Sequence, residues 1–191
     1  MEASARLFVG LALGPELGER ALAPVQALLD PGAWRLGRAE GLHVTLAFLG
    51  DVERGLLPGL SAALARELAG APAPRLVLDR AGAFPRPGAE RVLWLGLREE
   101  PEGAGRLAEL ARRAAVAARA AGAAPREDAG RPFHPHVTVA RPRRPPGRAP
   151  AAFHALAPEL PFRPAEAALF ESLAGGGAMV YAPRAVFPLA P

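Results

Sequence analysis

The chain has 191 residues, of which half are hydrophobic and 22% are charged. This length and balance predict one folded globular domain, residues 1–191, and exclude a disordered chain. No apolar run approaches the ~18–20 residues needed to cross a bilayer. The absence of cysteine excludes disulfides, thiolate metal sites and a cysteine nucleophile.

The net charge of +4 is carried on the basic side by arginine alone, because the sequence contains no lysine. Asparagine and isoleucine are also missing, while Ala, Gly, Pro and Arg abound, a skew typical of coding bias toward G and C. A high arginine count is therefore weak evidence for a polyanionic partner. The placement of the arginines matters more than their number.

The first part of the chain predicts alternating strands and helices. The apolar stretch near the N-terminus is interpreted as a strand and not a signal peptide, because acidic Glu16 and Glu19 follow it closely, and we expect a cytoplasmic protein. Asp51 is expected to cap a helix. The elements expected here are a strand over 6–13, a helix over 15–29, a strand over 42–49 and a helix over 51–69.

The second part predicts more strands than helices. The stretch from Arg141 to Pro150 combines prolines with arginines and is expected to be a mobile basic loop. Whether its arginines steer a nucleic acid or are only solvated stays open. The elements expected here are strands over 75–84 and 91–97, a helix over 103–121, a strand over 134–140, and paired strands over 165–173 and 178–187.

The tetrapeptide His-Val-Thr-apolar occurs twice, in LHVTLAFLG from Leu42 and in HPHVTVAR from His134. Residues i and i+2 of a strand point to the same face. The first copy therefore predicts His43 beside Thr45, with Ala47 leaving space next to them. The second copy repeats the arrangement with His136, Thr138 and Ala140.

Two imidazoles with two hydroxyls are suited to acid–base chemistry at a phosphorus centre. A neutral imidazole accepts a proton from water, an imidazolium donates one to a leaving group, and hydroxyls donate hydrogen bonds to charged oxygens. A single histidine in a strand is more often structural, but a packing accident has no reason to repeat the threonine. A zinc site on His43, His134 and His136 is the alternative, although threonine is a poor zinc ligand. The residues themselves do not show which histidine is the acid.

The paired H-x-T-x motifs resemble the two-histidine (2H) phosphoesterase superfamily. LHVTLAFLG and PHVTVAR, in this order, are similar to its RNA 2',3'-cyclic phosphodiesterase branch, also called RNA 2',5'-ligase. RLFVGLAL, FPRPGAERVLWLGL and LFESLAGGGAMVYAPRAVFPL agree with that branch, so the likeness spans nearly the whole chain. The resemblance implies an α+β fold of two pseudo-symmetric lobes, each an antiparallel sheet with outer helices, around a central cleft.

The resemblance also implies a function. It is hydrolysis of a 2',3'-cyclic phosphate, at RNA ends or on nucleotides, to a 2'-phosphate, with 2',5' RNA ligation as the reverse reaction. In this reading His136 is the proton acceptor, His43 is the proton donor, and Thr45, Thr138 and Arg141 bind substrate. No metal, cofactor, membrane or obligate protein partner is implied. A non-catalytic module that binds RNA ends is the alternative.

Residues near the motifs carry further expectations. Strand parity places Arg141 opposite His136 unless the strand twists or ends before it. We expect the other side chains as follows: Phe48 and Trp94 in the core, His134, Trp34 and Arg35 at the rim of the cleft, and His154 at the surface.

Overall fold

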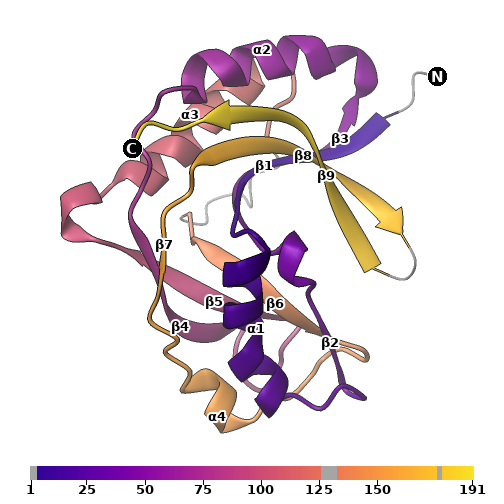
Figure 1. Ribbon diagram of the computed structural model, residues 1–191. Coiled ribbons are helices and arrows are strands. Elements are labelled where there is room, and N and C mark those ends of the chain that lie inside the picture. The colour runs from indigo at the N-terminus through magenta and orange to yellow at the C-terminus, as the bar shows by residue number, and fades with distance from the viewer. Residues whose placement is uncertain (1–3, 126–132, 176–177) are drawn as a thin grey trace.

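The computed structural model describes residues 4–125, 133–175 and 178–191. Its strands form one curled antiparallel sheet in the order β7-β4-β5-β6-β3-β1-β8-β9, and β2 pairs with β6 (Figure 1). The strands are β1 (Ser4–Ala12), β2 (Trp34–Leu36), β3 (His43–Glu53), β4 (Leu76–Phe84), β5 (Val92–Glu99), β6 (His136–Pro142), β7 (Leu160–Phe162), β8 (Glu166–Gly175) and β9 (Ala178–Pro188). The helices are α1 (Pro15–Leu28), α2 (Leu57–Leu68), α3 (Arg106–Ala120) and α4 (Ala151–His154), with short 3₁₀ turns η1 (Ala39–Gly41), η2 (Arg54–Leu56) and η3 (Pro101–Gly103).

The sheet consists of two halves of matching order. One half runs β3, β1, β8, β9 outward from the centre, and the other runs β6, β5, β4, β7. The halves meet where β3 and β6 pair through a single register pair, Val44 with Val137. The α+β fold with two pseudo-symmetric halves is therefore confirmed, and the two halves share one continuous sheet.

Helices cover one face of each half. α2 and α3 pack against each other and over the half that contains β3 and β9, whereas α1 and α4 contact β7 and β4 (Figure 1). The helix α3 packs with one face toward the sheet because its buried residues recur at helical spacing on one stripe. These residues are Leu107, Leu110, Ala114, Ala117 and Ala118. None of the helices in the described ranges combines the length and hydropathy of a transmembrane span.

Several local expectations were wrong. Asp51 does not cap a helix, because β3 continues to Glu53 and Asp51 lies opposite Arg6 of β1, with 3.8 Å between their charged atoms. The helix α2 begins only at Leu57, with Pro58 in its first turn. The sequence did not predict β2, β7 or α4, which are too short to show a clear hydrophobic period.

The basic stretch after β6 is tied to the rest of the fold. The Gly147 N–H donates to the carbonyl of Glu90 at 2.8 Å, and the Arg143 N–H donates to the carbonyl of Ala33 at 2.8 Å. The Arg143 guanidinium also donates to the carbonyl of Pro31 at 3.0 Å. Hydrogen bonds to Glu90, Ala33 and Pro31 therefore hold this loop in place, contrary to the expectation of a mobile loop.

Candidate active site

The two His-Val-Thr motifs lie on neighbouring strands at the centre of the sheet. Val44 of β3 and Val137 of β6 are register partners, and both are fully buried. The residues on either side of them point to the other, half-exposed face of the sheet. Counting one residue outward from the valine pair gives two opposed pairs: His43 with Thr138, and Thr45 with His136. The motifs therefore form one site in which each imidazole belongs opposite the hydroxyl of the other half.

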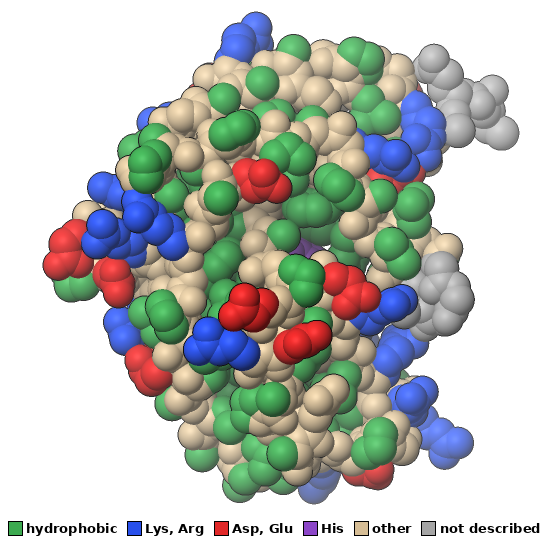
Figure 2. Space-filling view, viewed as in Figure 1, with side chains coloured by type: hydrophobic (Ala, Val, Ile, Leu, Met, Phe, Trp, Pro, Cys, Tyr) green, Lys and Arg blue, Asp and Glu red, His purple; other side chains and the backbone are tan. Residues whose placement is uncertain are grey.

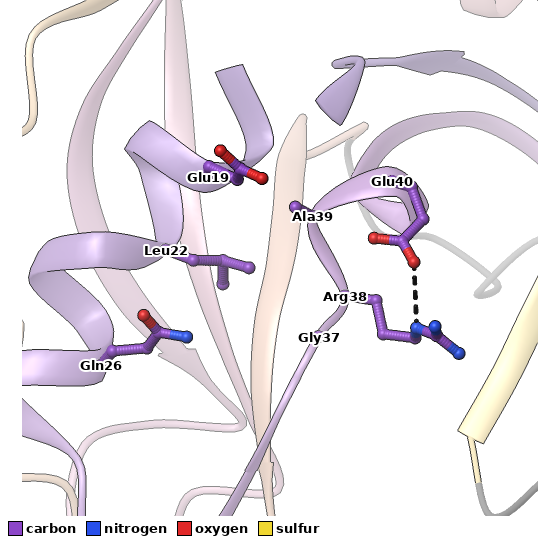
Figure 3. A pocket seen from close by; sticks show the side chains of 7 residues that line it. All are labelled: Glu19, Leu22, Gln26, Gly37, Arg38, Ala39 and Glu40. Atoms are coloured by element: carbon purple, nitrogen blue, oxygen red, sulfur yellow. Dashed lines mark hydrogen bonds and ion pairs between the residues drawn. The ribbon is translucent and has the colours of Figure 1, made fainter. Parts of the chain in front are cut away.

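This face of the molecule is hollowed. Figure 2 shows a histidine side chain at the bottom of a recess, bordered by hydrophobic and backbone atoms. A separate cavity of about 350 Å³ lies between α1 and the segment before β3 and contains none of the motif residues (Figure 3). It is lined by Glu19, Leu22, Gln26, Gly37, Arg38, Ala39 and Glu40. This cavity is therefore distinct from the site that the two motifs form.

A β-bulge follows each motif. The register of β1 against β3 shifts after Thr45, and the register of β5 against β6 shifts after Thr138. An extra residue in one strand turns the following residues over. Ala47 and Ala140 are consequently buried in the core, 7% and 1% exposed. The expectation that they line the site was therefore wrong.

The same bulges bring the third residue after each threonine to the site face. Phe48 is half-buried in a small cluster with Phe8 and Phe170, so the expectation that it lies in the main core was wrong. Arg141 is exposed, and its charge lowers the pKa of His136. The parity objection to Arg141 therefore does not hold, because parity fails at a bulge.

Both imidazoles are held in the same tautomer. The Nδ1 of His43 lies 2.8 Å from the carbonyl oxygen of Gly41, and the Nδ1 of His136 lies 2.8 Å from that of His134. A carbonyl oxygen only accepts hydrogen bonds, so each Nδ1 carries a proton. Nε2 is therefore the nitrogen of each ring that gains or loses a proton.

His43 is enclosed by aromatic rings. Phe8 stacks on it with ring centroids 4.5 Å apart, and Tyr181 of β9 meets it edge-on at 4.7 Å. Burial lowers the pKa of His43, the hydrogen bond to Gly41 opposes that shift, and the charge of His136 lowers the pKa further. The sensitivity of His43 to the charge of His136 agrees with their placement in one site.

His136 has a more cationic neighbourhood. The ring of Phe84 meets it edge-on, with centroids 5.0 Å apart. Burial lowers the pKa of His136, the hydrogen bond to His134 opposes the shift, and the charges of His134 and Arg141 lower the pKa further. Without substrate, both catalytic candidates are therefore biased toward the neutral imidazole.

The other expected residues lie as follows. His134 is exposed, as expected, and it also supplies the backbone acceptor for His136. Trp94 is buried beside Phe84 and His134, as expected. His154 is not a free surface residue, because its Nε2 lies 3.2 Å from the buried carboxylate of Glu90. Trp34 is buried, whereas its neighbour Arg35 is exposed.

Sequence reasoning did not identify Phe8, Tyr181 or the carbonyl of Gly41 as parts of the site. Phe8 and Tyr181 come from strands that approach His43 only in the folded sheet, so no local pattern marks them. Among the residues that the structure describes, no three His, Asp or Glu side chains gather in a way that could hold a metal ion. The zinc alternative on His43, His134 and His136 therefore lacks its ligand cluster.

The chain is similar to known proteins over most of its length. A family model described as the 2'-5' RNA ligase superfamily matches residues 15–176. A relative from Escherichia coli K12, named RNA 2',3'-cyclic phosphodiesterase, is 36% identical over 136 residues, which are 71% of each chain. A relative of the same name from Thermus thermophilus is 36% identical over 153 residues, 79% of this chain and 75% of the relative.

Solved structures show the same fold. The crystal structure of E. coli LigT complexed with 3'-AMP superimposes with a TM-score of 0.78 and 32% identity, over 98% of this chain and 99% of that chain. The apo form of E. coli LigT gives a TM-score of 0.77 and 31% identity, over 99% of both chains. Because the match in sequence and in fold extends over most of its length, the chain belongs to the 2'-5' RNA ligase superfamily.

Proposed function

We propose that this protein is a phosphodiesterase that needs no metal and hydrolyses a 2',3'-cyclic phosphate, at RNA ends or on nucleotides, to a 2'-phosphate. The observation that carries the proposal is the crosswise placement of two His-Thr pairs about the Val44–Val137 pair, with both imidazoles in one tautomer. The relatives named RNA 2',3'-cyclic phosphodiesterase and the LigT complex with 3'-AMP support the substrate class.

The surroundings of the two histidines support different roles. Burial, and after it the charges of His134 and Arg141, disfavour the imidazolium of His136, so the neutral ring is the proton acceptor for water. His43 is enclosed by Phe8 and Tyr181, and among the described residues His136 is the charged group that acts on its pKa. An anionic phosphate bound beside His43 favours its imidazolium, and the ring then serves as the proton donor.

The reaction follows from these roles. Water attacks phosphorus and gives its proton to Nε2 of His136, while the bond from phosphorus to the ribose 3' oxygen breaks. Nε2 of His43 donates a proton to that oxygen, which leaves a 2'-phosphate and a 3'-hydroxyl. Thr45 and Thr138 donate hydrogen bonds to the phosphoryl oxygens, and Arg141 balances their charge.

Both halves of the sheet are needed for this chemistry, because each supplies one histidine and one threonine. Residues 1–191 therefore act as one bilobal domain. With the 5'-hydroxyl of a second RNA end in place of water, the same attack on phosphorus, with the ribose 3' oxygen leaving, would join the ends through a 2',5' bond. An RNA substrate is compatible with the cytoplasmic location expected from the sequence.

The test is incubation with a nucleoside 2',3'-cyclic phosphate in the presence of a chelator, with separation of 2'- and 3'-phosphate products. We expect only the 2'-phosphate in the wild type. We expect kcat/KM to fall at least ~10³-fold in both His43→Ala and His136→Ala, because each removes one partner of an acid–base pair. Full activity in either variant contradicts the mechanism. Binding of the cyclic phosphate without turnover in the wild type indicates a non-catalytic RNA-end binding module instead.

A further inference from the structure

Two arginines lie directly opposite each other on the neighbouring strands β2 and β6. β2 pairs antiparallel with the end of β6, and Arg35 is the register partner of Arg141. Their neighbours Trp34 and Ala140 are buried, 4% and 1% exposed, so these residues point into the core. Arg35 and Arg141 therefore point to the opposite face, which carries His136. The bulge after Thr138 is what places Arg141 there.

Neither of the two arginines has a counter-charge in the part of the chain that the structure describes. Both are exposed, and no described side chain forms an ion pair or hydrogen bond with either of them. Several other arginines of the described chain are paired, such as Arg38 with Glu40 at 3.1 Å and Arg184 with Glu171 at 2.6 Å. Basic side chains gather on the side of the molecule where β2 lies (Figures 1 and 2).

Like charges directly opposite each other on neighbouring strands are unfavourable. An arrangement that costs stability and has no internal partner is typical of a functional site. Two guanidiniums on adjacent strands, about 5 Å apart at the backbone, present several N–H donors to one ligand. The ligand that this geometry fits is a phosphate with free non-bridging oxygens.

The position of the pair indicates which phosphate it binds. Arg141 is the third residue after Thr138, which faces the cyclic phosphate in the proposed function, and Arg35 lies one strand farther out. In an RNA chain the nearest other anion is the phosphodiester on the 5' oxygen of the same ribose. We infer that Arg35 binds this internucleotide phosphate together with Arg141, whose guanidinium then lies between this phosphate and the cyclic phosphate. The preferred substrate is then the end of an RNA chain and not a free nucleoside cyclic phosphate, an inference that rests on the proposed function.

The test compares three substrates: adenosine 2',3'-cyclic phosphate, the same compound with a 5'-phosphate, and an adenylyl dinucleotide that ends in the cyclic phosphate. For the wild type we expect kcat/KM to be roughly tenfold higher or more with the 5'-phosphate, because guanidinium–phosphate bonds are charge-assisted. We expect the dinucleotide to show the same gain, which decreases as salt is added.

Variants then assign the gain to Arg35. Arg35→Gln is expected to bring the ratio between phosphorylated and unphosphorylated substrate close to one, mainly through KM, because the contact is the same in ground and transition states. Arg35→Lys is expected to restore part of the ratio, since it keeps the charge but loses the planar fork. The matched control is Arg66→Gln on α2, which removes one exposed positive charge on the far side of the fold and should leave the ratio unchanged.

Each outcome decides between the two proposals. No turnover of any of the three substrates overturns the proposed function and this inference with it. Turnover of adenosine 2',3'-cyclic phosphate with no gain from the 5'-phosphate overturns the inference alone, as does a gain that Arg35→Gln leaves intact. A purely structural Arg35 would lower Tm and slow all substrates alike when replaced. The inference instead expects an unchanged or higher Tm, because the repulsion from Arg141 is relieved.

Discussion

The buried carboxylate of Glu171 stabilises the hairpin whose aromatic side chains enclose His43. Glu171 of β8 is 2% exposed and lies between two arginines, Arg54 of η2 and Arg184 of β9. Arg54 reaches both of its oxygens, and Arg184 Nε donates to Oε2 at 2.7 Å. The same hairpin carries Phe170 and Tyr181, which pack around Phe8 and His43. Replacement of Glu171 is therefore expected to destabilise the protein and to loosen the enclosure of His43.

The magnitude follows from the contacts. A hydrogen bond to a charged group contributes about 1.5–3 kcal/mol net. The arginine side chains are 44% and 40% exposed and can be rehydrated, so we take the lower value for each of them. We expect Glu171→Ala to lower the free energy of unfolding by about 3 kcal/mol, and Glu171→Gln, which keeps one acceptor, by about 1.5 kcal/mol.

The assay is urea unfolding of wild type and both variants between pH 7 and pH 3. Burial raises the pKa of Glu171, but the hydrogen bonds from Arg54 and Arg184 outweigh it, and the pKa in the folded protein is lowered from 4.5. A lowered carboxyl pKa stabilises the fold fully above 4.5, and this contribution is lost as pH falls through the folded pKa. The difference between wild type and Glu171→Ala should therefore shrink below pH 4.5.

The matched control is Glu109→Gln on α3, where an exposed carboxylate pairs with Arg112 and Arg113. Although these arginines lower the pKa of Glu109 to about 2, its exposure predicts little change in stability. A loss below ~0.5 kcal/mol in Glu171→Ala at pH 7, or a loss that does not depend on pH, would refute the reasoning.

Three further predictions concern the site itself. Nitrogen NMR of the free protein above pH 7.5 should show both His43 and His136 protonated at Nδ1 and bare at Nε2; the opposite tautomer at either ring would contradict the hydrogen bonds to Gly41 and His134. Arg141→Gln should raise the pKa of His136 by removing a nearby positive charge, so the acidic limb of the kcat/KM profile should move to higher pH, and an unmoved limb would argue against His136 as the base. Gly82→Ala should destabilise the protein by about 1–3 kcal/mol, because the new Cβ would lie 2.3 Å from the buried ring of Trp94, and the loss in Tm should exceed that of Gly59→Ala in α2, where a Cβ meets nothing within 4 Å.

The sequence could identify the chemistry because the threonine at i+2 repeats with the histidine. Two strands with one polar face each were enough to predict that His43, Thr45, His136 and Thr138 share a site. The bulges that follow them could not be predicted, since alternation gives no sign of an extra residue. For that reason Ala47 was expected at the site and Phe48 in the core, and the opposite is observed.

Long-range pairing explains the other differences. Asp51 carries a sensible capping side chain, yet pairing with β1 extends β3 past it. The position of Arg35 beside Arg141 could not be predicted, because β2 has only three residues and is defined by its pairing with β6. The contact between the carboxylate of Glu90 and His154 could not be predicted either, since the two residues are distant in the chain and meet only after folding.

The order of the strands has a consequence for synthesis on the ribosome. The half of the sheet with His136 is built from strands that follow one another between residues 76 and 162. The half with His43 needs β1 to pair with β8, which is synthesised only after β2 to β7. A nascent chain therefore holds β1 with one edge unpaired until β8 and β9 have emerged from the ribosome.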